Sequence, residues 1–183
     1  MAKIKYRINN VIFTLLIASY FALILNVSLL LKLITTFNSL KAFRIGFVIS
    51  IPIVLIAVLN IFFTLFAIKY VEKYFYFIIT LLSSILSYVT YHYGIIFDIN
   101  MIVNTMQTDY REIIAYLNLP ITAWIFFLGI IPSIGIFKLN FNHAIWYKDI
   151  FYKLISVLIS LFIIIATIGF YYKDYAAIKR NNP

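Results

Sequence analysis

Long apolar stretches alternate with short polar breaks along most of this chain. A helix needs about 20 mostly apolar residues to cross the hydrocarbon of a bilayer. The pattern predicts spans at about residues 11–31, 46–68, 74–93, 121–137 and 150–171. We therefore expect an all-α, polytopic membrane protein, with about five transmembrane helices within residues 1–172.

The apolar pattern breaks between Tyr91 and Asn118, where polar residues recur at helical spacing. Between positions 99 and 117, apolar residues follow the i, i+3, i+4, i+7 pattern of one helical face. Asn104, Thr108 and Glu112 fall at i, i+4 and i+8 on the opposite face. This segment predicts an amphipathic helix, about 99–117, that lies in the outer membrane–water interface. Asn118, followed by Leu119 and Pro120, predicts the capped start of the next helix.

The polar face of this segment is a candidate binding site for a lipid head group. A carboxylate at Glu112 could pair with an ammonium group, while Asn104 and Thr108 could hydrogen-bond to phosphate or ester oxygens. The alternative is an ordinary interfacial helix with a solvated polar face. Periodicity alone leaves both interpretations open.

Composition supports the membrane assignment. The chain is 64% hydrophobic and 11% charged, with a mean hydropathy of +1.02, whereas soluble domains are roughly half apolar and about a quarter charged. Its net charge of +9 is spread thinly, which suits contact with anionic lipid head groups. No basic stripe with interleaved aromatic residues appears, so we expect no nucleic-acid partner.

Orientation is predicted from the basic start of the chain. Lys3, Lys5 and Arg7 precede the first span, which is too long for a cleaved signal peptide. Basic residues before a first span favour a cytoplasmic N-terminus. Five spans then place residues 91–118 and the C-terminus on the outer side of the inner membrane.

Catalytic and metal-binding patterns are lacking in the 183 residues. There is no cysteine, which excludes thiolate chemistry. His92, Asp98 and Glu112 do not form a recognisable metal-ligand spacing. No nucleophile–base pair, glycine-rich phosphate loop or zinc motif occurs, so we assign no catalytic or metal-ligating residue.

Three runs resemble a known family: YGIIFDINMIVNTMQTDYREI, LPITAWIFFLGIIPSIGIFKLNF and the closing YYKDYAAIKRNNP. They are similar to the membrane domain of the lipid A phosphoethanolamine transferases, which include the mobile colistin-resistance enzymes. The resemblance is clear over residues 88–183 and diffuse before them. It implies a five-helix inner-membrane domain joined to a periplasmic domain that holds zinc and a threonine nucleophile.

The resemblance also implies a role for the polar face. In this family the matching positions, here Asn104, Thr108 and Glu112, help to hold the donor lipid phosphatidylethanolamine. The catalytic domain is absent from this sequence, so zinc is expected only there and no cofactor is expected in this chain. Residues 173–183 are then a juxtamembrane segment leading to that periplasmic domain, a possible partner.

We therefore predict a domain that anchors the enzyme and positions phosphatidylethanolamine for modification of lipid A, a modification that confers polymyxin resistance. Such a chain is expected to be inactive alone, which leaves its enzyme status open. Two alternatives are a small transporter or channel subunit and a helical membrane scaffold. Few ionisable groups in the spans weigh against the transporter, and the lack of a G-x-x-x-G motif weighs against the scaffold.

Overall fold

The computed structural model describes residues 7–40, 45–94, 118–142 and 145–181. The chain divides into two compact units. Unit 1 comprises Met1–Glu72 with Leu139–Pro183, and unit 2 comprises Lys73–Lys138.

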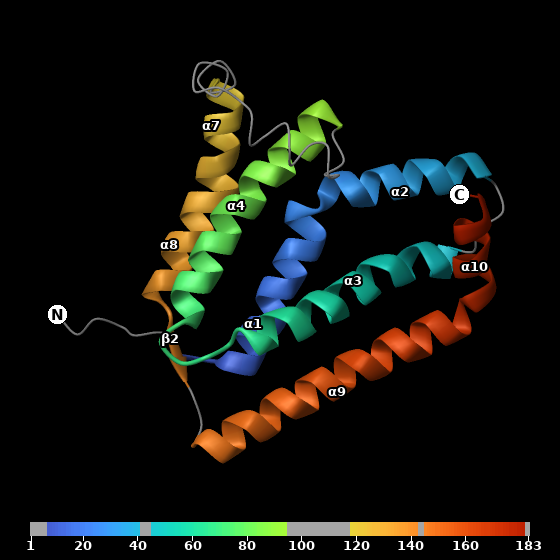
Figure 1. Ribbon diagram of the computed structural model, residues 1–183. Coiled ribbons are helices and arrows are strands. Elements are labelled where there is room, and N and C mark those ends of the chain that lie inside the picture. The colour runs from blue at the N-terminus through green and yellow to red at the C-terminus, as the bar shows by residue number, and fades with distance from the viewer. Residues whose placement is uncertain (1–6, 41–44, 95–117, 143–144, 182–183) are drawn as a thin grey trace. The chain divides into compact units, whose positions relative to one another are not determined.

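Both units are built almost entirely from helices (Figure 1). Unit 1 contains β1 (Arg7–Asn9), α1 (Asn10–Tyr20), the π-helical turn η1 (Phe21–Leu25), α2 (Val27–Leu40), α3 (Ile45–Leu65), β2 (Asn140–Asn142), α9 (Trp146–Phe170) and α10 (Tyr172–Asn181). Unit 2 contains α4 (Glu72–Tyr93), α7 (Leu119–Ile125), the π-helical turn η2 (Phe126–Ile130) and α8 (Ile131–Lys138). The first residue of α4, Glu72, is the last residue of the N-terminal part of unit 1.

The predicted all-α membrane fold is confirmed. Among the described residues, four helices are long and apolar enough to cross a membrane: Ile45–Leu65, Glu72–Tyr93, Leu119–Lys138 and Trp146–Phe170. A bent pair, Asn10–Leu25 with Val27–Thr35, brings the number to five if it is one span. The predicted interfacial helix at 99–117 lies outside the described residues.

The first span differs from the single helix predicted at 11–31. The helix axis turns by 55° between Asn10–Leu25 and Val27–Thr35. Asn26 lies at the turn, and its side-chain amide donates a 2.9 Å hydrogen bond to the carbonyl of Phe21. A side chain that competes for helix carbonyls beside a π-helical turn is a recognised cause of such bends.

In unit 1, α3 lies between α1 and α9, as Figure 1 shows. Phe63 of α3 is fully buried and contacts Phe21 with ring centroids 4.9 Å apart. Before α1, β1 pairs in parallel with β2, with Arg7 opposite Asn140 and Asn9 opposite Asn142. The sequence did not predict this short pair, because three residues show no periodicity.

In unit 2, α4 runs antiparallel to the continuous helix formed by α7, η2 and α8. Phe77 contacts Phe137 with ring centroids 5.0 Å apart near one end, and Tyr91 contacts Trp124 at 5.2 Å near the other. Small residues face α4 between these ends. Gly129 packs against Ser84, and the Ser133 hydroxyl approaches the Phe77 carbonyl at 3.5 Å.

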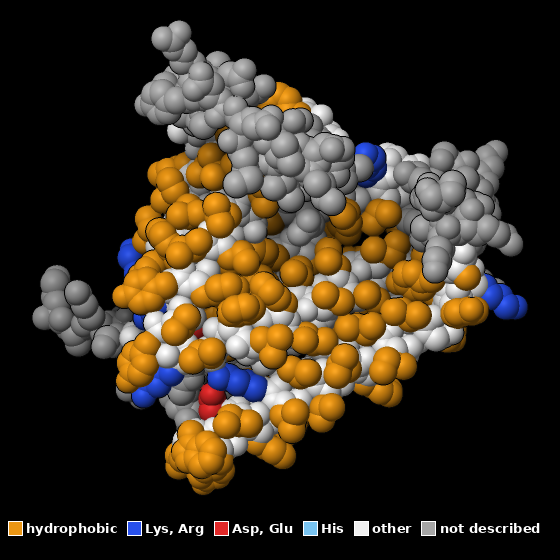
Figure 2. Space-filling view, in the orientation of Figure 1, with side chains coloured by type: hydrophobic (Ala, Val, Ile, Leu, Met, Phe, Trp, Pro, Cys, Tyr) orange, Lys and Arg blue, Asp and Glu red, His pale blue; other side chains and the backbone are white. Residues whose placement is uncertain are grey.

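Large apolar side chains remain exposed along the helices, and Figure 2 shows them spread over the viewed face. On α9, Phe162 is 71% exposed and Ile165 is 70% exposed. Soluble proteins rarely leave large contiguous apolar areas in water. These side chains are therefore placed to contact lipid hydrocarbon.

Candidate functional site

The predicted head-group site lies outside the described residues. This holds for Asn104, Thr108 and Glu112, and also for Asp98, which was considered as a metal ligand with His92. The structure does describe the two helix ends that border residues 95–117, both in unit 2. The candidate site is therefore built from these helix ends.

Local sequence explains why the helices end where they do. After α4 finishes at Tyr93, Gly94 adopts a φ of +64°, a left-handed conformation that glycine provides at helix C-termini without steric cost. Asn118 starts the next helix: its side-chain oxygen accepts a 3.1 Å hydrogen bond from the amide of Ile121. The predicted Asn118 cap, with Pro120 in the first turn, is confirmed. The end of α4 and the start of α7, which residues 95–117 connect, thus lie at the same end of the antiparallel helices of unit 2.

Aromatic side chains gather at this end of unit 2. Tyr91 stacks on Trp124 with ring centroids 5.2 Å apart, and Tyr88 stacks on His92 at the same separation. Tyr88 also meets Trp124 edge-on at 6.0 Å. Such side chains combine an apolar body with a polar tip, so they suit the depth at which lipid head groups meet hydrocarbon. We name Tyr88, Tyr91, His92 and Trp124 the aromatic cluster.

Three buried polar atoms accompany the aromatic cluster. The Ser87 hydroxyl, the Tyr88 hydroxyl and the Trp124 indole Nε1 have no hydrogen-bond partner among the described residues. Trp124 Nε1 can only donate, while the two hydroxyls can donate or accept. A buried polar group costs free energy unless it is paired. The hydrogen-bonding capacity of these three atoms is therefore unused within the part of the chain that the structure describes.

Sequence reasoning did not identify Ser87, Tyr88 or Trp124. All three lie inside predicted apolar spans, where an isolated polar residue gives no periodic signal. Among the described residues, no three His, Cys, Asp or Glu side chains lie close enough together to hold a metal ion.

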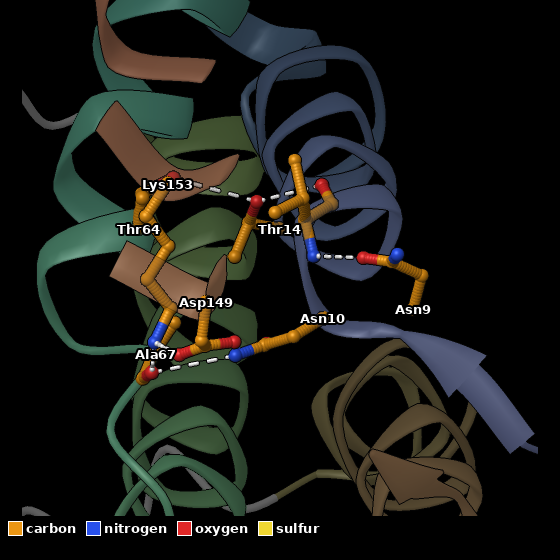
Figure 3. A network of polar contacts seen from close by, with 8 residues as sticks. Asn9, Asn10, Thr14, Thr64, Ala67, Asp149 and Lys153 are labelled. Atoms are coloured by element: carbon orange, nitrogen blue, oxygen red, sulfur yellow. Dashed lines mark hydrogen bonds and ion pairs between the residues drawn. The ribbon is translucent and has the colours of Figure 1, made fainter. Parts of the chain in front are cut away.

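A second polar region lies in unit 1, at the start of α1 and α9 and the end of α3 (Figure 3). Asn10 donates a 3.3 Å hydrogen bond from Nδ2 to the carbonyl of Ala67, and Lys153 donates to the same carbonyl at 2.5 Å. The Lys153 ammonium also lies 2.5 Å from Asp149 Oδ2, one helical turn earlier. The Ala67 carbonyl, which follows the end of α3, thereby accepts hydrogen bonds from both α1 and α9.

Deeper in unit 1, polar side chains connect the same helices. Asn60 of α3 donates from Nδ2 to the hydroxyls of Ser156 at 3.0 Å and Ser160 at 2.9 Å on α9. Thr64 approaches Thr14 of α1, with 3.4 Å between their hydroxyl oxygens. No nucleophile in this network lies beside a general base. Its geometry suits helix packing rather than bond chemistry.

Comparison with known proteins agrees with this architecture. Residues 55–183 match the family model of the phosphoethanolamine transferases EptA/EptB. The chain is 26% identical over 176 residues to the phosphatidylethanolamine transferase Mcr-2 of Escherichia coli, covering 96% of this chain and 32% of that protein. It is 29% identical over 178 residues to the phosphoethanolamine transferase EptA of Salmonella typhimurium, again covering 96% and 32%.

The fold has a solved counterpart. The integral membrane lipooligosaccharide phosphoethanolamine transferase A of Neisseria meningitidis superposes with a TM-score of 0.88 at 24% identity, covering 97% of this chain and 33% of that one. This chain thus spans about a third of the length of the relatives that it matches. It belongs to the phosphoethanolamine transferase EptA/EptB family, in which it corresponds to the N-terminal membrane domain.

Proposed function

We propose that this chain anchors a phosphoethanolamine transferase in the inner membrane and positions its donor lipid, phosphatidylethanolamine, for transfer to lipid A. The observation that carries the proposal is the family match over residues 55–183, which covers the whole of unit 2, including residues 95–117. One matched relative is itself named a phosphatidylethanolamine transferase. The chemistry of transfer would belong to a zinc-containing periplasmic domain, as the family resemblance implies.

The arrangement of unit 2 supports a head-group site at its 95–117 end. Glu112 supplies a carboxylate for the ethanolamine ammonium, and Asn104 and Thr108 supply donors for phosphate or ester oxygens. The Tyr88 hydroxyl and Trp124 Nε1 add donors at the helix ends to which this segment connects. Holding the donor in one place would raise the rate by orientation, without this chain making or breaking a bond.

The distribution of charge gives the transporter alternative little support. Within α3 there is no Asp, Glu, Lys, Arg or His, and in α4 and the α7–α8 helix such residues lie only within two residues of the ends. Proton and ion pumps rely on ionisable groups inside the membrane. We also propose that the N-terminus is cytoplasmic and that residues 95–117 face the periplasm, as the basic start of the chain favours.

The test compares lipid binding by the purified chain in nanodiscs. We expect phosphatidylethanolamine to bind more tightly than phosphatidylglycerol, which keeps the phosphate but lacks the ammonium. Glu112→Gln should weaken phosphatidylethanolamine binding by at least about tenfold, because a hydrogen bond to a charged group contributes roughly 1.5–3 kcal/mol and each 1.4 kcal/mol is a factor of about ten. Asp109→Asn is the matched control, since it removes a carboxylate from the same segment at a position outside the i, i+4, i+8 series of Asn104, Thr108 and Glu112.

Equal binding of the two lipids would refute a donor site, as would equal losses in Glu112→Gln and Asp109→Asn. Trp124→Phe extends the test to the described residues. This change keeps an aromatic ring and removes the indole N–H, so a weaker affinity with unchanged folding would place Trp124 Nε1 among the head-group donors.

A further inference from the structure

A groove of about 480 Å³ opens along unit 1 between α1, α3 and α9. Apolar side chains form most of its wall, among them Ile12 and Leu15 of α1, Ile53 and Ala57 of α3, and Ile159 and Ile163 of α9. Its volume lies in the range of about 300–1,000 Å³ that is typical of ligand pockets. The groove is separate from the 95–117 end of unit 2, because every residue lining it belongs to unit 1.

One helical stripe of α9 runs along the groove. Tyr152, Ser156, Ile159 and Ile163 all line it, at the three- and four-residue steps that keep side chains on one face. Lys148 lies four residues before Tyr152 and continues the same stripe by one turn. Its side chain is exposed. The Lys148 ammonium group therefore lies just beyond one end of the apolar groove.

Polar groups gather at this same end. Asn9 lines the groove immediately before α1 begins. Tyr152 carries a hydroxyl there, and Lys153 and Asp149 form their ion pair in the same turns of α9. The groove thus has a polar, positively charged end followed by an apolar length. That is the complement of a molecule with one anionic group and a hydrocarbon tail.

We propose that this groove binds one membrane phospholipid, with an acyl chain lying between α1, α3 and α9 and its phosphate at Lys148. The groove lies between membrane-spanning helices whose outer surfaces contact hydrocarbon. Lipid acyl chains are therefore the molecules that surround it and can fill it. The polar end lies where α1 and α9 begin, which places the phosphate in the leaflet on that side of the membrane. This lipid is distinct from the proposed donor, because every residue lining the groove belongs to unit 1, whereas residues 95–117 belong to unit 2.

Neighbouring positions on α9 allow a matched test. Ile159 lines the groove and is 55% exposed, whereas Leu158 is 54% exposed and does not line it. Because both side chains are more than half exposed, a tryptophan at either position leaves the buried core unchanged. Ile159→Trp should fill the groove, and Leu158→Trp should not. Ile12→Trp blocks the groove from α1, where Ile12 is also exposed and lines it.

The measurement is the phospholipid retained per chain after detergent extraction and gel filtration, by native mass spectrometry. We expect Leu158→Trp to retain as much phospholipid as the wild-type protein, and Ile159→Trp and Ile12→Trp to retain one phospholipid fewer per chain. Lys148→Gln should weaken retention about fivefold, the effect of about one basic residue near a membrane surface. Lys173→Gln, an exposed lysine on α10, should leave retention unchanged.

Several results would overturn the proposal. The proposal is wrong if the wild-type protein retains no phospholipid. It is also wrong if Ile159→Trp and Leu158→Trp retain equal amounts of phospholipid. A lipid-free dimer that Ile159→Trp dissociates would assign the groove to a second copy of the chain. Glu112→Gln separates this lipid from the donor: it should leave the groove lipid bound even if head-group selectivity is lost.

Discussion

At the scale of single residues, Asn60 forms the polar link between α3 and α9. It is 2% exposed, and its Nδ2 donates hydrogen bonds to the hydroxyls of both Ser156 and Ser160. Its Oδ1 is buried and has no hydrogen-bond partner among the described residues. An amide that satisfies its donors and leaves its acceptor buried gains less than the number of its hydrogen bonds suggests.

This balance predicts a modest coupling between Asn60 and Ser160. A double-mutant cycle with Asn60→Ala and Ser160→Ala should give about 0.6 kcal/mol, and at most about 1.7 kcal/mol, the range seen for polar pairs between membrane helices. Unfolding in mixed micelles of dodecyl maltoside and sodium dodecyl sulfate would measure it. Ser19→Ala serves as the control, since the Ser19 hydroxyl bonds the Leu15 carbonyl of its own helix. Coupling of Asn60 to Ser19 as strong as to Ser160 would contradict this assignment.

Two asparagines show which local features are readable from sequence. Asn118 precedes Leu119 and Pro120, a pattern with a direct local cause, and the structure confirms the cap. Asn26 also bonds a backbone carbonyl close by, at Phe21, yet it coincides with a 55° bend inside an apolar run. Nothing in the flanking pattern of apolar residues distinguishes a bend from a straight continuation.

At the scale of helices, close packing in unit 2 depends on small residues. Gly129 and Ser133 are four positions apart and face α4, where Ser84 is fully buried. Because lipid tails are as apolar as leucine, membrane helices gain little from burying apolar area and depend instead on close contact. A search for G-x-x-x-G does not find this pair, since serine replaces the second glycine.

Gly129→Ala should destabilise unit 2 by about 1–3 kcal/mol, the usual cost of overpacking a well-packed site. A Cβ at Gly129 would clash with the Ser84 hydroxyl and lie 3.2 Å from Ser84 Cβ and 3.3 Å from Leu81 Cδ2. Gly135, further along the same continuous helix, gives a matched control, because a Cβ there meets nothing within 4 Å. Gly135→Ala should be neutral or stabilising by up to about 1 kcal/mol, from helix propensity alone.

Thermal unfolding of the two alanine variants in detergent would test this difference. Equal midpoints for Gly129→Ala and Gly135→Ala would show that α4 and the α7–α8 helix do not need the close approach at Gly129.

At the scale of the whole molecule, the order of spans predicts which connections share a side of the membrane. The connection after α3 and the start of α9 should be cytoplasmic, and the start of α7 and the connection after α9 should be periplasmic. The natural chain has no cysteine, so single cysteines can report each side. Tyr70, Trp146, Leu119 and Tyr172 are suitable positions, exposed by 78%, 75%, 83% and 67%.

A membrane-impermeant maleimide added to spheroplasts should label Leu119→Cys and Tyr172→Cys. It should reach Tyr70→Cys and Trp146→Cys only after the membrane is permeabilised, and the cysteine-free parent chain controls for background. The reverse pattern would invert the proposed orientation. Labelling of Tyr70→Cys and Leu119→Cys from the same side would contradict α4 as a span.

Sequence alone determined that this is an all-α membrane protein with about five apolar segments and a cap at Asn118. Hydrophobic length and helical period are properties of contiguous residues, and a bilayer imposes them before any tertiary contact forms. Only the tertiary structure revealed the bend at Asn26, the contact between Gly129 and Ser84, the aromatic cluster and the groove ending near Lys148. These features join residues distant in sequence, or select one of several conformations that the same apolar pattern allows, and the physical reason is packing rather than composition.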